Sequence, residues 1–293
     1  MLLNSPTDDC EFTGKEGRLY VVATPIGNQD DITLRALKTL ARVDLVAAED
    51  TRHTGRFLSF HKIKTRLISY HEHNEKERTP ELIDRLKKGA TIALVSNAGT
   101  PTVSDPGYRL VREAINHDIK VIPIPGASAV VAALSVSGLP TDSFVFVGFP
   151  AKKKGKRLTQ LKELVSEQRT IVFYESPKRI SGFLDEIMQI MGDRNAILCR
   201  ELTKLHEEFV RGVLSEIVFD LKNRPSIKGE CTLLLTGCEG HERISIATIR
   251  NEIENEMKTS GFKLTDLSKK VAKKYGIPSR RVYDEALRIK SKR

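Results

Sequence analysis

The chain has 293 residues, about the length of two ordinary domains. Hydrophobic residues make up 40% of it and charged residues 29%, a balance that excludes a disordered chain, a collagen-like repeat and a disulfide mini-protein. The net charge is +10, and clustered positive charge is typical of proteins that bind a polyanion, although solubility alone also explains such an excess.

The sequence predicts a cytoplasmic protein. Its four cysteines include no C-x-x-C pair, which favours free thiols in a reducing compartment over disulfides or a zinc site. Residues 1–17 lack the apolar stretch of a secretory signal and are expected to form a flexible tail. Residues 121–141 carry no charge, but prolines and glycines interrupt them, so a buried strand, a turn and a buried helix are expected there and no membrane span.

Apolar runs alternate with amphipathic stretches through the first half of the chain. Strands are predicted at 19–23, 45–48, 67–70, 92–95 and 121–124, and helices at 33–41, 81–87 and 108–116. Because these strands are rich in Val, Ile and Leu and alternate with helices, the pattern favours a parallel sheet covered by helices on both faces.

A second series of elements begins after a predicted linker near residues 138–142. Its strands are predicted at 144–148, 171–174, 196–199 and 231–235, and its helices at 158–165 and 180–191. Together the two series predict an α/β protein with an N-terminal domain over residues 18–139 and a second α/β domain over residues 140–240.

The tail over residues 241–293 holds 14 Lys or Arg against 7 Asp or Glu. Helical spacing is predicted over 246–258, from 264 onwards and over 280–289. The break at 275–279 gives the last two helices the outline of a helix-turn-helix unit. Many small helical tails share that outline, so it is the basic charge that favours a nucleic-acid partner.

Polar segments follow the apolar strands at the point where each strand ends. They are residues 24–28, 48–52, 95–107, 125–129, 174–179 and 199–204. The carboxyl ends of parallel strands are the usual place of a ligand site, so these segments are expected to line one cleft shared by the two domains. The first segment has a single glycine, which disfavours a dinucleotide-binding fingerprint.

Glu49 and Asp50, followed by Arg52, stand at the end of the second predicted strand. Buried carboxylates are costly unless they are paired or used in chemistry. The pair is therefore either functional or a helix N-terminal cap with a salt bridge, and the sequence favours neither reading.

Two other polar positions are interpreted structurally. Asp105 is expected to cap the next helix, with Pro106 at its first position. His71 and His73 have the look of a metal pair, but their polar neighbours favour solvated side chains, so no metal site is predicted.

Taken together, the segments resemble those of the tetrapyrrole (corrin/porphyrin) methylase superfamily, and within it the ribosomal RNA small subunit methyltransferase I family. The motifs are TPIGN at 24–28, AEDTR at 48–52, SNAGTPTVSDPG at 96–107, PGASA at 125–129, YESPKR at 174–179 and KGE at 228–230. The resemblance covers residues 18–240, and six motifs in order make it specific.

The resemblance implies two α/β domains that hold S-adenosylmethionine in the cleft between them, with the tail as a small helical extension. It also implies a homodimer and methyl transfer to the ribose 2′-oxygen of a cytidine in the decoding region of 16S ribosomal RNA. The residues implied to border the cofactor are Pro25, Ile26, Gly27, Gly99, Thr100, Val103, Ser128, Ala129, Tyr174 and Leu202.

One position departs from the family pattern. Members of the family usually have Asp where this chain has Asn97. An asparagine keeps a side-chain acceptor oxygen but loses the charge. If the side chain only shapes the loop through hydrogen bonds, which is the reading we favour, the activity is expected to survive the change.

Methyl transfer to a ribose hydroxyl gains from a base within hydrogen-bond reach. The candidates at the cleft edge are Glu49, Asp50 and Glu175, and the first two are preferred. Basic residues are expected to hold RNA phosphates together with the tail. They are Arg52, Lys152, Lys153, Lys154, Lys156, Arg157, Lys178 and Arg179.

Other functions stay open from the sequence alone. A methylase of a small tetrapyrrole would share the cofactor cleft but would not need the basic run or the basic tail. A non-catalytic RNA-binding assembly factor could keep the fold without the activity. An NAD-dependent oxidoreductase is disfavoured because the glycine fingerprint is missing.

Overall fold

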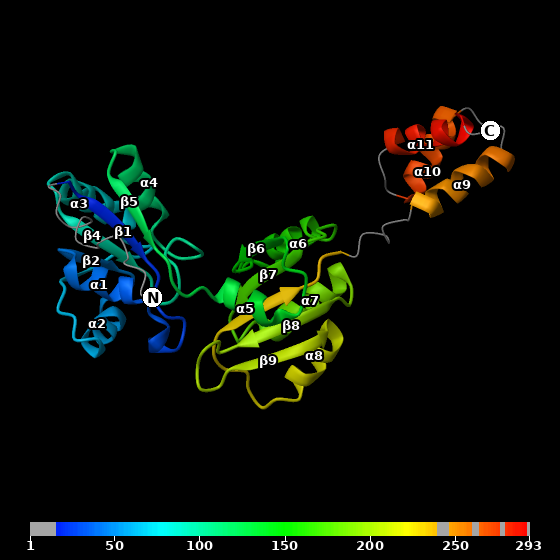
Figure 1. Ribbon diagram of the computed structural model, residues 1–293. Helices are drawn as coiled ribbons and strands as arrows, with labels where there is room; N and C mark the ends of the chain where they lie inside the picture. Colours follow the sequence, from blue (N-terminus) through cyan, green and yellow to red (C-terminus); the bar gives the residue numbers. More distant parts are fainter. Residues whose placement is uncertain (1–15, 239–245, 260–263, 276–278, 292–293) are drawn as a thin grey trace, which may run out of the picture. The chain divides into compact units, whose positions relative to one another are not determined.

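The computed structural model describes residues 16–238, 246–259, 264–275 and 279–291. Within these residues the chain forms two compact units, one built on two five-stranded sheets and one on the C-terminal helices (Figure 1). The predicted N-terminal tail lies almost wholly outside the described residues, and so does most of the predicted break at 275–279.

The first sheet is parallel throughout, with the strand order β3-β2-β4-β1-β5. Its strands are β1 (Arg18–Val22), β2 (Leu45–Ala48), β3 (Leu67–Ser69), β4 (Thr91–Val95) and β5 (Lys120–Ile124). Each end lies within one residue of its predicted position, so the expected parallel sheet is confirmed for this half of the chain.

Helices cover both faces of this sheet, as predicted. They are α1 (Leu34–Arg42), α2 (Thr51–Phe60), α3 (Glu75–Lys87) and α4 (Tyr108–Asn116), with a short 3₁₀ turn η2 (Gln29–Asp31). Helices α3 and α4 pack on one face and α1 and α2 on the other (Figure 1). Neighbouring strand residues such as Leu19 and Tyr20 therefore point into different cores, and both are fully buried.

Two details of this half differ from the prediction. Helix α2 was not predicted, because only Thr54 and Leu58 of it are buried and Gly55 interrupts the pattern. Helix α3 begins at Glu75 instead of 81, since Pro80 lies inside its second turn and not at its start.

The second sheet is mixed, with the order β6-β7-β10-β8-β9. Its strands are β6 (Phe144–Gly148), β7 (Thr170–Glu175), β8 (Asn195–Arg200), β9 (Glu208–Val213) and β10 (Cys231–Leu235). Only β6 and β7 pair in parallel, so the parallel pattern of the first half does not extend here. The sequence did not predict β9, an edge strand without a fully buried residue.

The helices of the second half lie on opposite faces of this sheet. They are α5 (Ala129–Ser137), α6 (Lys154–Glu163), α7 (Ile180–Met191) and α8 (Leu214–Lys222). Helices α6, α7 and α8 share one apolar core with the sheet, and α5 packs on the other face. Helix α8 was not predicted, and α6 begins four residues before the predicted 158–165.

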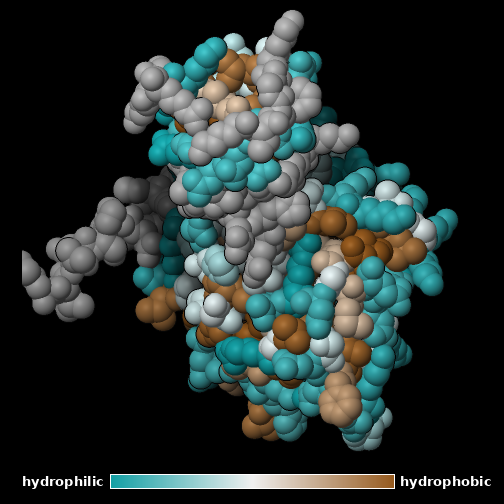
Figure 2. Space-filling model, turned by 90° about the vertical axis from the view of Figure 1, so that its right-hand side faces the viewer, coloured by the Kyte–Doolittle hydropathy of each residue, from teal (hydrophilic) through white to brown (hydrophobic). Residues whose placement is uncertain are grey.

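The apolar stretch at 121–141 forms β5, a turn and α5, which confirms the expected strand, turn and helix. Among the described residues no helix combines the length and apolarity that a membrane span requires. On the face shown in Figure 2, apolar side chains lie in small groups among hydrophilic ones.

The smaller unit contains α9 (Ile246–Thr259), α10 (Leu264–Tyr275) and α11 (Ser279–Ser291). Their core is formed by Ile253, Leu267, Val271, Ala272, Val282 and Ala286. An ion pair between Arg250 and Glu285 joins α9 to α11 at 2.5 Å. The three helical segments of the tail are thus confirmed.

Candidate active site

The turn after β1 is bound to the long loop that follows β4. The backbones of Thr24 and Gly99 exchange two hydrogen bonds, of 2.8 and 3.0 Å, and the Thr24 hydroxyl donates to the Ser96 carbonyl oxygen at 3.2 Å. Farther along the loop, the Thr100 hydroxyl donates to the carbonyl oxygen of Ala127, in the turn after β5, at 3.4 Å. Three strand ends of the first sheet therefore meet, as the sequence predicted.

The same turn contacts the second sheet. The Asn28 N–H donates to Oγ1 of Thr203, in the turn after β8, at 2.9 Å. A Cβ on Gly27 would lie 2.5 Å from Cγ of Lys204 and 2.7 Å from the carbonyl oxygen of Leu202. Only glycine leaves room for so close an approach, which explains the residue type at position 27.

Several residues predicted to border a cofactor gather in one apolar cluster. Ile26, Ala129, Tyr174 and Leu202 pack there although they come from four different elements. The Tyr174 ring also lies edge-on to Phe146, with centroids 4.9 Å apart. Burial raises the pKa of Tyr174 to about 12, so its phenol stays protonated at neutral pH.

The other predicted cofactor residues are placed as follows. Gly99 has φ +73°, and a Cβ there would lie 3.5 Å from Ile26. Ser128 is the residue before α5, but its hydroxyl does not cap that helix. Val103 lies in the long loop and is 40% exposed. The Ser128 carbonyl oxygen accepts a hydrogen bond from the N–H of Ala132, a residue of the apolar cluster, at 2.9 Å.

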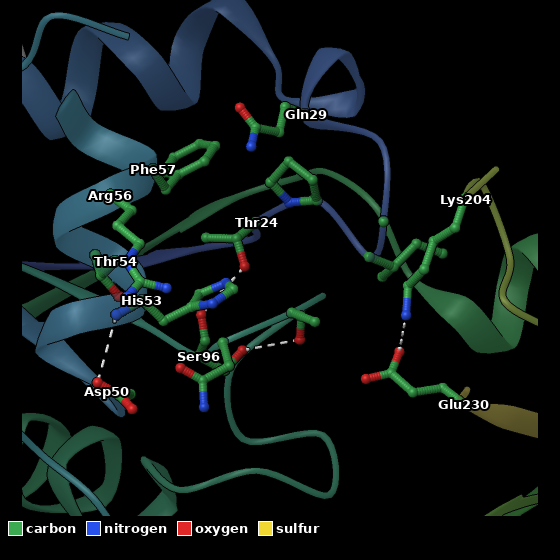
Figure 3. A pocket seen from close by; sticks show the side chains of 15 residues that line it. Thr24, Gln29, Asp50, His53, Thr54, Arg56, Phe57, Ser96, Lys204 and Glu230 are labelled. Carbon is green, nitrogen blue, oxygen red and sulfur yellow. Dashed lines mark hydrogen bonds and ion pairs between the residues drawn. The ribbon is translucent and has the colours of Figure 1, made fainter. Parts of the chain in front are cut away.

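A cavity of about 540 Å³ opens beside this cluster. Figure 3 shows side chains of α2 on one side of it and Lys204 with Glu230 on the other. The lining residues are Thr24, Pro25, Ile26, Gly27, Gln29, Asp50, His53, Thr54, Arg56, Phe57, Ser96, Asn97, Ala98, Lys204 and Glu230. The cavity thus joins predicted cofactor residues to polar residues of both sheets.

Asp50 caps helix α2. Its carboxylate accepts hydrogen bonds from the backbone N–H groups of Arg52 and His53, and the Arg52 guanidinium lies 3.0 Å away. The side-chain bond from Arg52 is the main reason that the pKa of Asp50 falls to about 2. The capping reading of this residue is therefore confirmed, and its carboxylate is a weak base.

Asp105, by contrast, does not cap helix α4. Gly107 occupies the cap position and Pro106 lies before the helix, so that prediction was wrong. Burial, and next the negative charge of Glu49, raise the pKa of Asp105 to about 6, against a hydrogen bond from Ser96. Asp105 also lines a second cavity of about 420 Å³.

Glu49 lies in the same region. Its Oε2 accepts a hydrogen bond from the backbone N–H of Asn97 at 3.0 Å. The carboxylates of Glu49 and Glu230 both raise the pKa of Asp105, so the three acidic groups, from three different loops, share one electrostatic environment.

Glu175 belongs to a structural ion pair. Its side chain is 1% exposed, and Oε1 accepts from Ser176 N–H at 2.6 Å and from the Arg179 guanidinium at 2.6 Å. Its Oε2 has no hydrogen-bond partner among the described residues. Arg179 is thus occupied by Glu175 in this structure.

The predicted RNA-binding residues divide into two groups. Arg157 binds Glu186 at 2.6 Å, with about 15% of either side chain exposed, and like Arg179 is committed to an ion pair. The others are exposed, namely Arg52, Lys152, Lys153, Lys154, Lys156 and Lys178. Of these, Arg52 is bound to Asp50 but keeps 84% of its side chain accessible.

Several cavity residues were not predicted, among them His53, Arg56 and Phe57. Helix α2 was not predicted, so its side chains could not be placed. Lys204 binds Glu201 at 2.9 Å and Glu230 at 3.1 Å. Both ends of that cluster lie in segments that the sequence singled out, 199–204 and 228–230, but nothing in the sequence showed that they meet.

Comparison with known proteins agrees with this architecture. The profile of the Tetrapyrrole (Corrin/Porphyrin) Methylases matches residues 18–218. A ribosomal RNA small subunit methyltransferase I of Halalkalibacterium halodurans is 46% identical over 92% of this chain and 94% of its own length. The protein of the same name from Synechocystis sp. is 45% identical over 94% of this chain and 99% of its own length. The chain therefore belongs to the tetrapyrrole methylase family and, within it, to the ribosomal RNA small subunit methyltransferases I.

A shorter relative and two solved structures add to this. The protein of the same name from Thermotoga maritima is 48% identical and is matched along its full length by 76% of this chain. The crystal structure of the methyltransferase CobJ has TM-score 0.58 at 17% identity, covering 76% of this chain and 95% of that one. A uroporphyrin-III C-methyltransferase from Thermus thermophilus, complexed with S-adenosylhomocysteine, has TM-score 0.53 at 18% identity, covering 74% and 97%. These structures establish the fold.

Proposed function

We propose that this protein transfers a methyl group from S-adenosylmethionine to the ribose 2′-oxygen of a cytidine in the decoding region of 16S ribosomal RNA. The observation that carries the proposal is the apolar cluster of Ile26, Tyr174 and Leu202 beside a polar cavity. It offers an apolar site for the cofactor next to a polar site for a sugar. The names of the relatives support the ribosomal substrate.

The residues of the cluster fit S-adenosylmethionine. Ile26 and Tyr174 provide apolar surface for the adenosine, and backbone approaches closely at Gly27 and Gly99. The Ser128 hydroxyl, which α5 does not use, is available to the polar amino-acid end. When bound, the cofactor supplies a methyl group already activated by its sulfonium, so the task of the protein is to position the hydroxyl.

The hydroxyl must lose a proton during transfer. Of the three candidate bases, Asp50 is held by Arg52 with a pKa of about 2 and Glu175 is bound by Arg179. Glu49 accepts one hydrogen bond from Asn97 and lies near Asp105. We therefore assign proton acceptance to the Glu49–Asp105 pair, while Asp50 orients Arg52 and Glu175 orients the turn after β7.

Exposed lysines before and in the first turn of α6, together with the basic tail, are proposed to hold the RNA phosphates. Deleting residues 241–293 is expected to weaken binding of the small subunit and its salt dependence while sparing the cofactor. The Thermotoga maritima relative has no counterpart to about a quarter of this chain. We expect the tail to add affinity without being required for catalysis.

A homodimer is part of the proposal. Helix α5 presents Val131 and Val136 at 61% and 39% exposure while its other side packs on the second sheet. Apolar side chains exposed on one helix are suited to contact with a second copy. Sedimentation at micromolar concentration is expected to show a dimer that Val131→Asp weakens.

A ribosomal substrate also implies a cytoplasmic location.

The decisive experiment incubates the protein with methyl-labelled S-adenosylmethionine and small subunits that lack the modification. The label is expected on one cytidine, at the 2′-oxygen. Cofactor binding without any transfer would favour a non-catalytic RNA-binding factor. Transfer to a small tetrapyrrole and not to the subunit would favour the other branch of the family.

A further inference from the structure

One wall of the cavity comes from helix α2. His53, Arg56 and Phe57 line it from this helix (Figure 3). His53 and Arg56 are exposed, and within the described part of the chain neither side chain makes a hydrogen bond or an ion pair. Positions three apart lie on the same face of a helix. The two side chains therefore form a basic site for one phosphate group.

The floor of the cavity is polar. Thr24, Ser96 and Asn97 line it, and the Asn97 backbone N–H is bound to Glu49 at 3.0 Å. The Asn97 Oδ1 is buried and has no hydrogen-bond partner among the described residues. A buried carbonyl oxygen without a donor is costly, and a bound hydroxyl or amino group would relieve that cost.

The charge of the cavity limits how much phosphate it can hold. Glu230, with 74% of its side chain exposed, lies opposite α2 and binds Lys204 at 3.1 Å. Asp50 lies at the start of α2. Carboxylates on both sides repel further phosphate groups, so the walls favour a single phosphate beside Arg56.

The size of the cavity points to one nucleotide. Its volume of about 540 Å³ is within the range of small-molecule sites and far below that of an RNA helix. Bases are read by proteins after they leave the stack, by packing against aromatic rings. Phe57 supplies such a ring, because it is half-buried and lines the cavity.

We propose that this cavity holds a single ribonucleotide extruded from the RNA, with its phosphate at Arg56 and His53, its base against Phe57 and its ribose toward Asn97. The assignment rests on the proposed function, since it brings a ribose hydroxyl next to the cofactor cluster. It identifies α2 as the element that selects the target nucleotide.

Binding of cytidine 5′-monophosphate and of cytidine, measured by calorimetry in the presence of S-adenosylhomocysteine, tests the phosphate site. Arg56→Gln is expected to weaken binding of the monophosphate at least tenfold and to leave cytidine unchanged. Phe57→Leu, which keeps apolar packing, is expected to weaken both ligands. Arg66→Gln, an exposed arginine outside the cavity, is the matched control and is expected to change neither.

Methyl transfer to unmodified small subunits gives the second readout. Arg56→Gln is expected to lower kcat at least tenfold with little change in subunit affinity, because extrusion follows docking. Equal binding of the monophosphate by wild type and Arg56→Gln would overturn the proposal, as would no binding by a wild type that still methylates subunits. If the wild type transfers no methyl group to any subunit, it is the proposed function that fails.

Discussion

Two arginines beside the second sheet differ in their surroundings from one arginine beside the first. Beside the second sheet, Arg157 and Arg224 are largely buried and bind Glu186 and Glu208 at 2.6 and 2.7 Å. On α2, beside the first sheet, Arg56 is exposed and has no partner among the described residues. Arginines of the first kind fix the geometry of their surroundings, and Arg56 is available to a ligand.

The ion-paired arginines support the fold, whereas Arg56 is placed to take part in binding. The second sheet contributes turns that are held by ion pairs and close on the first sheet at Gly27 and Asn28. The first sheet contributes the unpaired polar groups of the cavity. A substitution that breaks one of these ion pairs should therefore act through stability, and one on α2 through binding and rate.

The largest effect is expected where the two sheets meet. In Gly27→Ala the new Cβ would lie 2.7 Å from the Leu202 carbonyl oxygen, so the turn after β8 must move. Displacement of about 1 Å is expected to lower methyl transfer about hundredfold. Gly182→Ala on α7 is the control, because no heavy atom outside the helix backbone lies within 4 Å of the added Cβ. It should stabilise the helix by up to about 1 kcal/mol. Equal rates for the two variants would show that the close approach is not needed.

The next effect compares two arginines directly. Arg157→Gln leaves the largely buried Glu186 without its partner, so the free energy of unfolding is expected to fall by about 2 kcal/mol in urea titrations. Arg56→Gln removes a side chain without a partner among the described residues. It is expected to change the free energy of unfolding by less than about 0.5 kcal/mol. The reverse order would mean that α2 supports the fold.

Much of the fold is predictable from apolar patterning, and the exceptions have physical causes. The run at 45–48 predicts β2 because all four of its residues are buried. Strand β9 has no such run, since it lies at a sheet edge, and α2 buries only two residues. Apolar periodicity in a sequence reflects burial, so helices and strands with few buried residues produce little apolar pattern.

The sequence identified the motifs of the site, but not the contacts that their residues make. Ile26 and Tyr174, which the resemblance assigned to one cofactor site, lie in one apolar cluster, whereas Asp105 was wrongly expected to be a cap. A capping aspartate and a buried one have the same local sequence. What distinguishes them here is burial and, next, the negative charge of Glu49, and both arise only in the folded chain.

The third prediction concerns Asp105, whose pKa of about 6 lies above its ordinary value of 3.8. The folded state therefore binds its proton more tightly than the unfolded state, and this stabilisation is lost as pH rises through 6. Asp105→Asn should raise stability at pH 7 by about 1 kcal/mol, after allowance for partial exposure, and not at pH 3. Urea titrations at both values measure this.

The same group governs the pH dependence of the rate. If the Glu49–Asp105 pair accepts the proton, methyl transfer should rise with pH around 6 and level off above it. Asp105→Asn should lower the plateau and remove that rise, with cofactor binding by calorimetry unchanged. A rise that persists unaltered in the variant would assign it to another group.

The smallest effect is expected at Asn97, which follows Ser96, a residue whose side chain lowers the pKa of Asp105. Asn97→Asp adds a carboxylate close to Glu49, whose Oε2 is bound to the backbone of residue 97. Like charges disfavour ionisation, so the pKa of Asp105 should rise further and the pH–rate rise should move upward by about half a unit. Asn97→Ser, which removes the amide without adding charge, is the control and should leave the midpoint unchanged. An unshifted midpoint in Asn97→Asp would place the new charge out of reach of Asp105 and make residue 97 a part of the cavity wall alone.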